Sequence, residues 1–578
     1  MATEPAQLPV PCSPFFILIP RGYRHKLPQN FDFRMKAYLV RILSEALATI
    51  SDQPLEADII IEKPRSPEHG DAATNLAMTL TKKLKMPPRK IAEAIKAALP
   101  MDDGYLSAVE IAGPGFINFR FSESWLYGQL AEILMRAEAY GKSSANAGKR
   151  MQIEFVSANP TGPLTVGHGR NAVLGDTIAR LLEWTGAKVD REYYFNNAGR
   201  QMRVLGESVR ARYLQKLGQD AELPEDGYQG GYIGDIAQTL IDEHDEALIS
   251  CPATDPVFKN AAEQAIFADI RQTLERMNII MDSFFNEHTL YEDGAIDRVV
   301  SRLRELDLAY DADGAVWFRT TTFGKEKDTV LVKSTGEPTY RLPDIAYHIS
   351  KLDRGYDTCI DIFGADHIAT YPDVVSAVKA LGYDSDRIDV QVYQFVTIVK
   401  DGEPVKMSTR KANYVTLDEL MDMVGSDVTR FFFLMRTPGT HLEFDLDQAT
   451  EQGEKNPVFY LQYAHARIHS ILAKAAEEYK LDSEAALGQL THPTEITLIK
   501  ELLQFPDMVA QGAQHREPHR LINYLNDVAA SFHRFYHDCR IMGEAPELAI
   551  ARVALLRATG TVLKNGLTIL GITAPERM

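Results

Sequence analysis

Two short segments of the chain combine glycine, histidine, hydroxyl and cationic residues in ways that suit phosphate binding. The first is Gly167-His168-Gly169, which begins a predicted helix directly after a predicted buried strand over 152–156. Glycines let a ligand approach the backbone, and a helix N-terminus attracts phosphate, to which His168 can donate a hydrogen bond. On its own such a triplet is more often a helix start with a surface histidine. The preceding buried strand favours a phosphate site.

The second segment, Lys406–Lys411, holds three cations and two hydroxyl groups within six residues. It follows a predicted strand over 390–399 and an Asp401-Gly402 turn, so it is expected to form a loop that binds phosphate. Considered alone, a solvated charged turn is the commoner explanation. The two segments stand about 240 residues apart.

The residues around these segments predict an α/β domain built on a parallel sheet. A strand over 152–156, a helix from 167 to 184 and a strand over 189–195 form a βαβ unit. The expected fold is a Rossmann-like catalytic domain over 147–450, with a helical insertion near 201–310 before the sheet resumes. Further strands are predicted over 315–319, 330–333, 359–363 and 390–399, and further helices over 342–352 and 369–381.

Different folds are predicted on the two sides of this domain. Residues 35–146 predict a small α+β domain, and residues 451–578 predict an all-α bundle. Residues 1–34 are rich in proline and predict a disordered extension, so that Met35 is a candidate initiator. The first domain is expected to contain helices over 35–50, 70–84 and 88–99 and strands over 58–61, 109–112 and 116–119.

The composition excludes several classes of protein. With 45% hydrophobic and 25% charged residues, the chain is neither disordered overall nor fibrous, and no apolar run is long enough to span a membrane. Its four isolated cysteines suggest a reducing cytoplasm. The net charge of −18 argues against a general nucleic-acid binder, but residues 35–140 sum to only −2 and residues 455–578 to 0. An anionic polymer is therefore expected to bind near the two ends of the chain.

Together the two phosphate-binding segments indicate a known class of enzyme. Thr165-Val166-Gly167-His168 and Lys406-Met407-Ser408-Thr409-Arg410 resemble the H-I-G-H and K-M-S-K-S signatures of class I aminoacyl-tRNA synthetases. Either signature is weak by itself, but both occur in the expected order and on the expected elements.

Further segments resemble the arginyl-tRNA synthetase family in particular, and the resemblance covers nearly everything after Met35. These segments are 68–75 in the first domain, 154–163, 286–291, 339–348 and 364–367 in the central domain, and 456–468 and 571–578 in the last.

This resemblance implies a two-step reaction. The carboxylate of L-arginine attacks the α-phosphate of ATP to give arginyl-adenylate, and a ribose hydroxyl of tRNA(Arg) then takes the arginyl group. Such chemistry needs positioning and charge neutralisation, so no general base is assigned. Mg²⁺ is expected to arrive with ATP, without a tightly bound metal or organic cofactor, and the protein is expected to be a monomer that does not bind membranes.

The resemblance also implies roles for particular residues. The catalytic residues are expected to be His168, Lys406, Ser408 and Arg410. The ATP-binding residues are expected to be Gly167, His168, Gly169, Gly364, Asp366, His367, Lys406 and Met407.

The arginine side chain requires a carboxylate, because a carboxylate can accept two parallel hydrogen bonds from a guanidinium group. Asp344 is the predicted partner, and Tyr340 lies four residues earlier on the same face if the helix has begun. By resemblance, Ser157 and Asn159 hold the ammonium and carboxylate ends. The alternatives are a helix N-cap for Asp344 and a core aromatic for Tyr340.

The tRNA is expected to contact both ends of the chain. Phe532, Phe535 and Tyr536 could stack on bases, although a buried helical seam is the favoured explanation of their spacing. Arg552, Arg557 and Arg577 are candidates for exposed charges that contact RNA. The residues expected to bind tRNA are Lys82, Lys83, Arg540, Arg552, Arg557 and Met578.

The chain departs from the family signatures at Thr165, where histidine is common, at Thr409, where the second lysine stands, and at Ala412, where glycine is usual. These departures leave open a non-catalytic tRNA-binding paralogue of the same family. A small-molecule nucleotidyltransferase is the third alternative, but it would not need the long helical region that follows the cationic loop.

Overall fold

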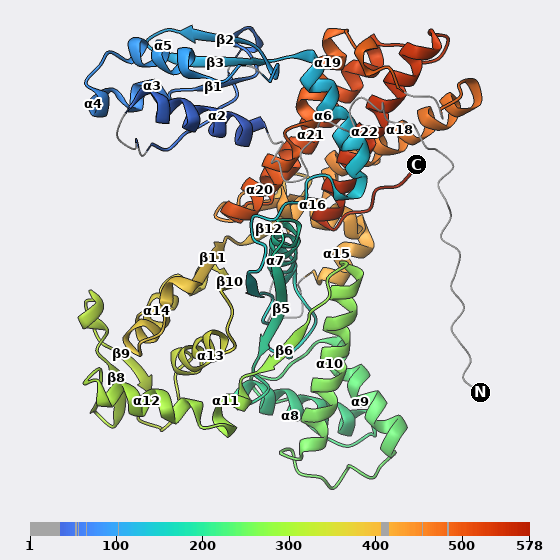
Figure 1. Cartoon of the computed structure of the whole chain (residues 1–578). Coiled ribbons are helices and arrows are strands. Elements are labelled where there is room, and N and C mark those ends of the chain that lie inside the picture. Colours follow the sequence, from blue (N-terminus) through green and yellow to red (C-terminus); the bar gives the residue numbers. More distant parts are fainter. Residues whose placement is uncertain are drawn as a thin grey trace, which may run out of the picture.

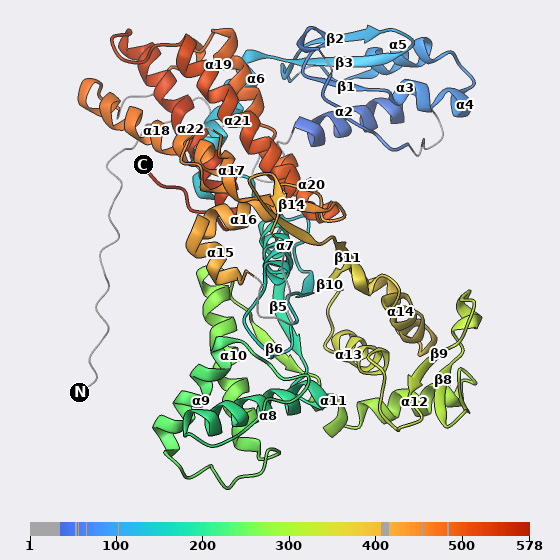
Figure 2. The same ribbon diagram turned by 180° about the vertical axis from the view of Figure 1, so that it is seen from behind.

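The computed structural model describes most of the chain from Met35 onward: residues 35–51, 55, 57–64, 66–101, 103–405, 415–453, 455–481 and 485–578. The extension predicted over 1–34 and the cationic segment Lys406–Lys411 therefore lie outside the described residues. Figures 1 and 2 show the N-terminal domain and the C-terminal helices at one end of the molecule, with the central sheet and the inserted helices extending away from them.

The N-terminal domain is an antiparallel sheet of order β1-β3-β2 with helices packed on it. The predicted apolar stripe of the first helix is confirmed, because Leu39, Ile42 and Leu43 are fully buried. The elements are α2 (Met35–Ile50), β1 (Ala72–Thr74), α3 (Leu76–Thr79), α4 (Thr81–Leu84), α5 (Pro88–Ala98), β2 (Leu106–Ala112) and β3 (Phe116–Phe121).

Two predictions for this domain are wrong. The helix predicted over 70–84 begins instead as strand β1, because these residues pair with β3, and only two short helices follow. The strand predicted over 58–61 does not form, since the described residues 57–64 join the sheet only through a bridge from Glu62 to Ala73.

The central domain contains a parallel sheet of order β11-β10-β4-β5-β6. The crossovers β4–α7–β5 and β10–α14–β11 run in opposite directions along it, so right-handed connections put α7 and α14 on opposite faces. Strand order therefore reverses between β4 and β10, where such sheets bind ligands. The elements are β4 (Arg150–Glu154), α7 (Val166–Trp184), β5 (Lys188–Phe195), β6 (Ser283–Asn286), α13 (Arg341–Asp353), β10 (Thr358–Gly364), α14 (Tyr371–Ala380) and β11 (Ile388–Tyr393).

Some predicted strands lie outside this sheet. The strands expected over 315–319 and 330–333 form a separate antiparallel sheet of order β7-β8-β9, because they pair with one another. The strand expected over 390–399 divides into β11 and β12, and β12 joins the sheet β13-β12-β14. These elements are β7 (Ala309–Ala312), β8 (Ala315–Phe318), β9 (Thr329–Val332), β12 (Val396–Lys400), β13 (Glu403–Pro404) and β14 (Leu442–Asp445).

Helices occupy most of the interval 201–310, which also holds the edge strand β6 and the start of β7. Its helices lie at the end of the molecule opposite to the N-terminal domain (Figures 1 and 2). They are α8 (Gly199–Lys216), α9 (Gly231–His244), α10 (Pro256–Arg276), α11 (His288–Glu292) and α12 (Ala295–Glu305).

The C-terminal region is helical, as predicted, and α6 (Glu123–Arg136) packs against its helices α19 and α22. Two ion pairs join the N-terminal domain to α19: Lys500 Nζ lies 2.6 Å from Asp71, and Lys63 Nζ lies 2.7 Å from Glu501. The helices are α15 (Leu417–Val424), α16 (Ser426–Leu434), α17 (Leu446–Thr450), α18 (Pro457–Glu478), α19 (Pro493–Leu502), α20 (Phe505–His515), α21 (His519–Asp538) and α22 (Pro546–Leu570).

A buried arginine connects α7 to the C-terminal helices. Arg430 on α16 is fully buried, and its guanidinium donates to the Asp176 carboxylate on α7 at 2.6 Å and to the Leu570 carbonyl at the end of α22 at 2.8 Å. A side chain on Gly571 would collide with this guanidinium, and the φ of Gly571 is +71°. The helix that starts at the predicted phosphate site is therefore anchored to the end of the last helix.

Candidate active site

His168 lies in the first turn of α7, next to the reversal of strand order. Its Nδ1 accepts a hydrogen bond from the Thr165 backbone N–H at 3.2 Å, in a capping box that also involves the Thr165 hydroxyl. Burial lowers the pKa of His168 to about 4, so the ring is neutral at pH 7. With Nδ1 as the acceptor, Nε2 carries the proton and can donate to a ligand. Thr165 therefore serves as the helix cap and sets the tautomer of His168.

The two glycines beside His168 have different surroundings. A Cβ on Gly169 would lie 2.6 Å from Leu417 Cδ1 and 2.9 Å from Phe433 Cε2, so this glycine lets α7 pack against α15 and α16. A Cβ on Gly167 would meet only Thr165 Oγ1, at 3.7 Å. The open side of Gly167 suits close approach of a ligand, whereas ATP binding by Gly169 stays a prediction.

The carboxyl ends of β10 and β11 face the start of α7. Asp366 and His367 are exposed after β10, and His367 stacks on Phe363 with ring centroids 5.3 Å apart. From β11, the Tyr393 hydroxyl donates to the Gly167 carbonyl at 3.5 Å. The structure thus brings the predicted ATP-binding groups after β4 and β10 to the same edge of the sheet.

Asp344 lies in the first turn of α13. The helix begins at Arg341, so Asp344 is not its N-cap and that alternative is wrong. Among the residues that the structure describes, none hydrogen-bonds to the Asp344 carboxylate, and burial raises the pKa of this group to about 7. Tyr340, the residue before the helix, is 80% exposed, which excludes a core aromatic. A half-buried carboxylate to which no described residue donates a hydrogen bond suits a cationic ligand.

The loop after β4 is held in an unusual backbone conformation. Val156 and Ser157 have φ angles of +66° and +47°, a region that non-glycine residues rarely adopt and that is enriched at functional sites. Ser157 Oγ donates to Glu154 Oε1 at 2.9 Å and accepts from the Tyr194 N–H at 3.2 Å. Asn159 Oδ1 accepts from the Asn196 N–H at 3.1 Å. Both predicted substrate residues are therefore fixed in place.

Glu287 is a further acidic group near Asp344 to which sequence reasoning assigned no role. It is 7% exposed and accepts hydrogen bonds from the Tyr194 hydroxyl at 2.6 Å and from Asn196 Nδ2 at 2.7 Å. Burial raises its pKa, and its charge also raises that of Asp344. The signal in the sequence was its position within segment 286–291, which resembles the family. A second carboxylate makes the pocket more acidic than predicted.

The described residues contain no group of three or more histidine, cysteine, aspartate or glutamate side chains that could hold a metal ion. Within the same part of the chain, every helix is too short or too polar to cross a membrane.

The predicted tRNA-binding residues differ in how exposed their side chains are. The prediction that Arg552 is an exposed contact is wrong, because Arg552 is 8% exposed and its Nε donates to the buried Glu495 carboxylate at 2.7 Å. Arg557 is partly buried. Phe532 and Phe535 are fully buried, which confirms the favoured explanation of a helical seam for these two residues, whereas Tyr536 is only partly buried. Exposed side chains are found at Lys82, Lys83, Arg540, Arg577 and Met578.

An aromatic surface on α18 was missed by sequence reasoning. The rings of Phe459 and Tyr463 stack with centroids 6.3 Å apart, and the Arg467 guanidinium lies 4.5 Å from the Tyr536 ring centroid. The i, i+4, i+8 spacing of Phe459, Tyr463 and Arg467 was the signal available in the sequence. Partly exposed aromatic rings beside an arginine suit stacking of unpaired bases.

The fold and this site define a class I aminoacyl-tRNA synthetase. Three family models match: "Arginyl tRNA synthetase N terminal domain" over residues 37–121, "tRNA synthetases class I (R), catalytic domain" over 129–430 and "DALR anticodon binding domain" over 461–578. The chain belongs to the arginyl-tRNA synthetase family.

Relatives in other organisms match along almost the whole chain. An "Arginine--tRNA ligase" of Salinibacter ruber is 55% identical over 94% of this chain and 100% of its own length. A protein of the same name from Desulfotalea psychrophila is 53% identical over 90% of this chain and 94% of its own. The solved "Thermus thermophilus arginyl-tRNA synthetase" is 24% identical with a TM-score of 0.75, covering 94% of this chain and 100% of that one, and shares its fold.

Proposed function

We propose that this enzyme activates L-arginine with ATP and attaches it to tRNA(Arg). The observation that carries the proposal is the Asp344 carboxylate, which has no hydrogen-bond partner among the described residues and lies close enough to Glu154, the last residue of β4, to interact with its charge. In a chain of this family, that carboxylate supplies the partner that a guanidinium group requires. The catalytic family model and the relatives named as ligases support an enzyme over a non-catalytic paralogue.

In the first step, the pocket would hold arginine by both ends. Asp344 accepts two hydrogen bonds from the guanidinium, with Tyr340 beside it, while Ser157 and Asn159 hold the ammonium and carboxylate. The carboxylate of the bound arginine then attacks the α-phosphorus of ATP in line, and pyrophosphate leaves with its Mg²⁺. Because these groups are held at one sheet edge, orientation supplies much of the rate.

The phosphates would be bound by α7 and by two loops. The Nε2–H of His168 and the N-terminus of α7 face the α-phosphate, and the residues after β10 line the ATP pocket. The catalytic roles of Lys406, Ser408 and Arg410 and the ATP contact of Met407 belong to this proposal as well. They rest on the sequence, because the loop lies outside the described residues.

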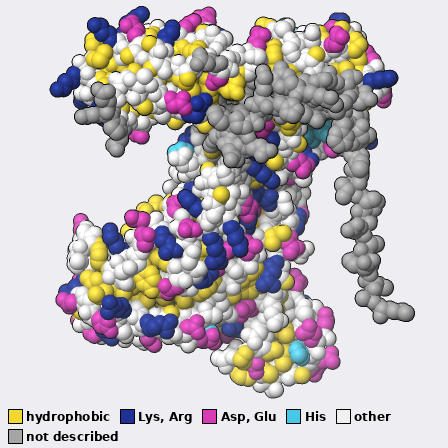
Figure 3. Space-filling model, viewed as in Figure 1, with side chains coloured by type: hydrophobic (Ala, Val, Ile, Leu, Met, Phe, Trp, Pro, Cys, Tyr) yellow, Lys and Arg dark blue, Asp and Glu magenta, His cyan; other side chains and the backbone are white. Residues whose placement is uncertain are grey.

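Binding of tRNA would use both ends of the chain. Figure 3 shows a hollow in the molecular surface between the N-terminal domain and the catalytic domain, with lysine and arginine side chains gathered over the catalytic domain beside it. Such cations attract the phosphate backbone. The anticodon loop would stack on the aromatic surface of α18. The proposed tRNA contacts are Lys82, Lys83, Arg540, Arg557 and Met578, on a monomer that acts in the cytoplasm.

The test is ATP–pyrophosphate exchange with each of the twenty amino acids, with and without bulk tRNA. We expect exchange with arginine alone and only when tRNA is present, because the signature loop lacks its second lysine at Thr409. Exchange with another amino acid would overturn the assignment of the pocket. Absence of exchange with retained binding of tRNA would establish the non-catalytic paralogue.

A further inference from the structure

Three carboxylates lie side by side under helix α13. In the parallel sheet, Asp361 on β10 is paired with Glu154 on β4, and Glu154 is paired with Glu192 on β5. All three are nearly inaccessible, with exposed fractions of 0%, 4% and 1%. Adjacent buried carboxylates repel each other and lose their hydration, so this carboxylate row requires cations in direct contact.

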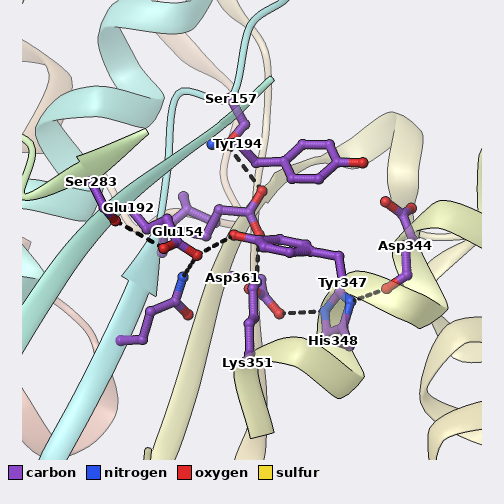
Figure 4. A network of polar contacts seen from close by, with 12 residues as sticks. Glu154, Ser157, Glu192, Tyr194, Ser283, Asp344, Tyr347, His348, Lys351 and Asp361 are labelled. Carbon is purple, nitrogen blue, oxygen red and sulfur yellow. Dashed lines mark hydrogen bonds and ion pairs between the residues drawn. The ribbon is translucent and has the colours of Figure 1, made fainter. Parts of the chain in front are cut away.

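Helix α13 and the residue that caps its C-terminus supply these cations. Lys351 is fully buried, and its Nζ donates to Glu154 Oε2 at 2.5 Å and also to Asp361 (Figure 4). Arg354 holds Glu192 with two hydrogen bonds, of 2.6 and 2.7 Å. Glu192 on β5 thus has its own cation, whereas Glu154 and Asp361 share Lys351.

His348, one turn before Lys351, is a further contact of the carboxylate row. Its Nε2 lies 2.9 Å from Asp361 Oδ2, and its Nδ1 lies 2.7 Å from the carbonyl oxygen of Asp344. Both neighbours are acceptors, so a proton on each ring nitrogen satisfies both contacts. Burial disfavours the charged ring, but the charge of Asp361 outweighs burial and raises the pKa of His348, which favours a proton on each ring nitrogen.

The same contacts reach both sides of the arginine pocket. Glu154 accepts a hydrogen bond from Ser157 Oγ at 2.9 Å, and His348 bonds to the backbone of Asp344 in the first turn of α13. Figure 4 shows Lys351 between the contacts that lead to Ser157 and those that lead to Asp344. Ser157 comes from the loop after β4, and Asp344 from a helix almost 200 residues later.

We infer that Lys351 is a positioning residue for arginine: by neutralising Glu154 and Asp361 together, it holds Ser157 and Asp344 at the separation that the substrate needs. The inference rests on the proposed function, in which these two residues bind arginine. ATP binds at the α7 side of the sheet edge, so loss of Lys351 affects the arginine site first.

The test compares Lys351→Met with a charge-balanced double variant, Glu154→Gln/Lys351→Met. The double variant removes one anion and one cation, keeps the Asp361–His348 pair and leaves an amide oxygen for Ser157. Lys325→Met is the matched control, because Lys325 pairs with the buried Asp373 carboxylate at 2.5 Å in the same domain without contact to the carboxylate row.

ATP–pyrophosphate exchange in the presence of tRNA gives KM for arginine and for ATP separately. In Lys351→Met we expect KM for arginine to rise about 100-fold, as for a displacement of about 1 Å, with KM for ATP within about threefold of the wild type. The double variant should recover at least about tenfold of that loss. Lys325→Met should leave both constants unchanged.

Several results would overturn the inference. They are an unchanged KM for arginine in folded Lys351→Met, an equal rise of both constants, or a double variant no better than the single one. If Lys351→Met does not fold, the double variant decides: it must fold and use arginine, since its charges are balanced. Wild-type enzyme without arginine-dependent exchange would refute the proposed function instead.

Discussion

The protonation of Asp344 predicts how arginine affinity depends on pH. Burial raises the pKa of this carboxyl to about 7 in the free pocket. Only the carboxylate can accept two hydrogen bonds from a guanidinium, so a proton must leave when arginine binds. Because the pKa is raised in the free state and falls on binding, affinity is greatest above pH 7 and is lost as pH falls.

The size of the effect follows from that pKa. A group of pKa 7 is about half protonated at pH 7, about one-tenth at pH 8 and about nine-tenths at pH 6. The dissociation constant for arginine should therefore rise about tenfold between pH 8 and pH 6. At pH 7, about half a proton should be released for each arginine bound.

Isothermal titration calorimetry with the enzyme–tRNA complex measures both quantities, using two buffers of different ionisation enthalpy to count protons. Asp344→Asn is the matched variant: it keeps the shape of the side chain but removes the charge. It should lose arginine affinity by about 2–5 kcal/mol, as for a broken buried charge pair, and should show no pH dependence between pH 6 and 8. A flat wild-type profile, or a slope that Asp344→Asn retains, would refute the reasoning.

Three other predictions concern the loop, the C-terminal bundle and α7. Lys406→Ala should lower kcat for exchange about 100-fold with little change in KM for arginine, because it removes phosphate neutralisation in the transition state. Arg552→Met should lower the free energy of unfolding by about 3–5 kcal/mol, since it leaves the buried Glu495 carboxylate without this cation. It should leave KM for tRNA unchanged in the folded protein. Gly169→Ala should cost about 1–3 kcal/mol of stability in urea titrations, because its Cβ would lie 2.6 Å from a leucine methyl group on α15.

Each of these predictions has a contrary outcome. A rise in KM for arginine at constant kcat in Lys406→Ala would place this lysine in the amino-acid pocket. Normal stability with weakened tRNA binding in Arg552→Met would restore this arginine as an RNA contact. Unchanged stability in Gly169→Ala would show that α7 has room to move, and Gly167→Ala, where the Cβ has space, is the control.

Short-range chemistry explains why much of the site could be predicted. The strand, the glycine-rich turn and the start of α7 are contiguous, so the residue types around His168 predict both the helix and its phosphate site. The same holds for Asp344 at the start of α13. Where local patterns were ambiguous the prediction failed, as in segment 70–84, whose first residues become a strand only by pairing with β3.

Only the tertiary structure decided which distant groups meet. Glu154, Glu192 and Asp361 become neighbours because the strand order β10-β4-β5 places them in one row. Arg552 has the charge of a surface residue, yet the packing of α22 on α19 buries it against Glu495. The sequence by itself thus determined most of the elements and the residue types available for catalysis. The fold determined which charges face each other without water, because burial and contact depend on strand order and helix packing rather than on neighbours along the chain.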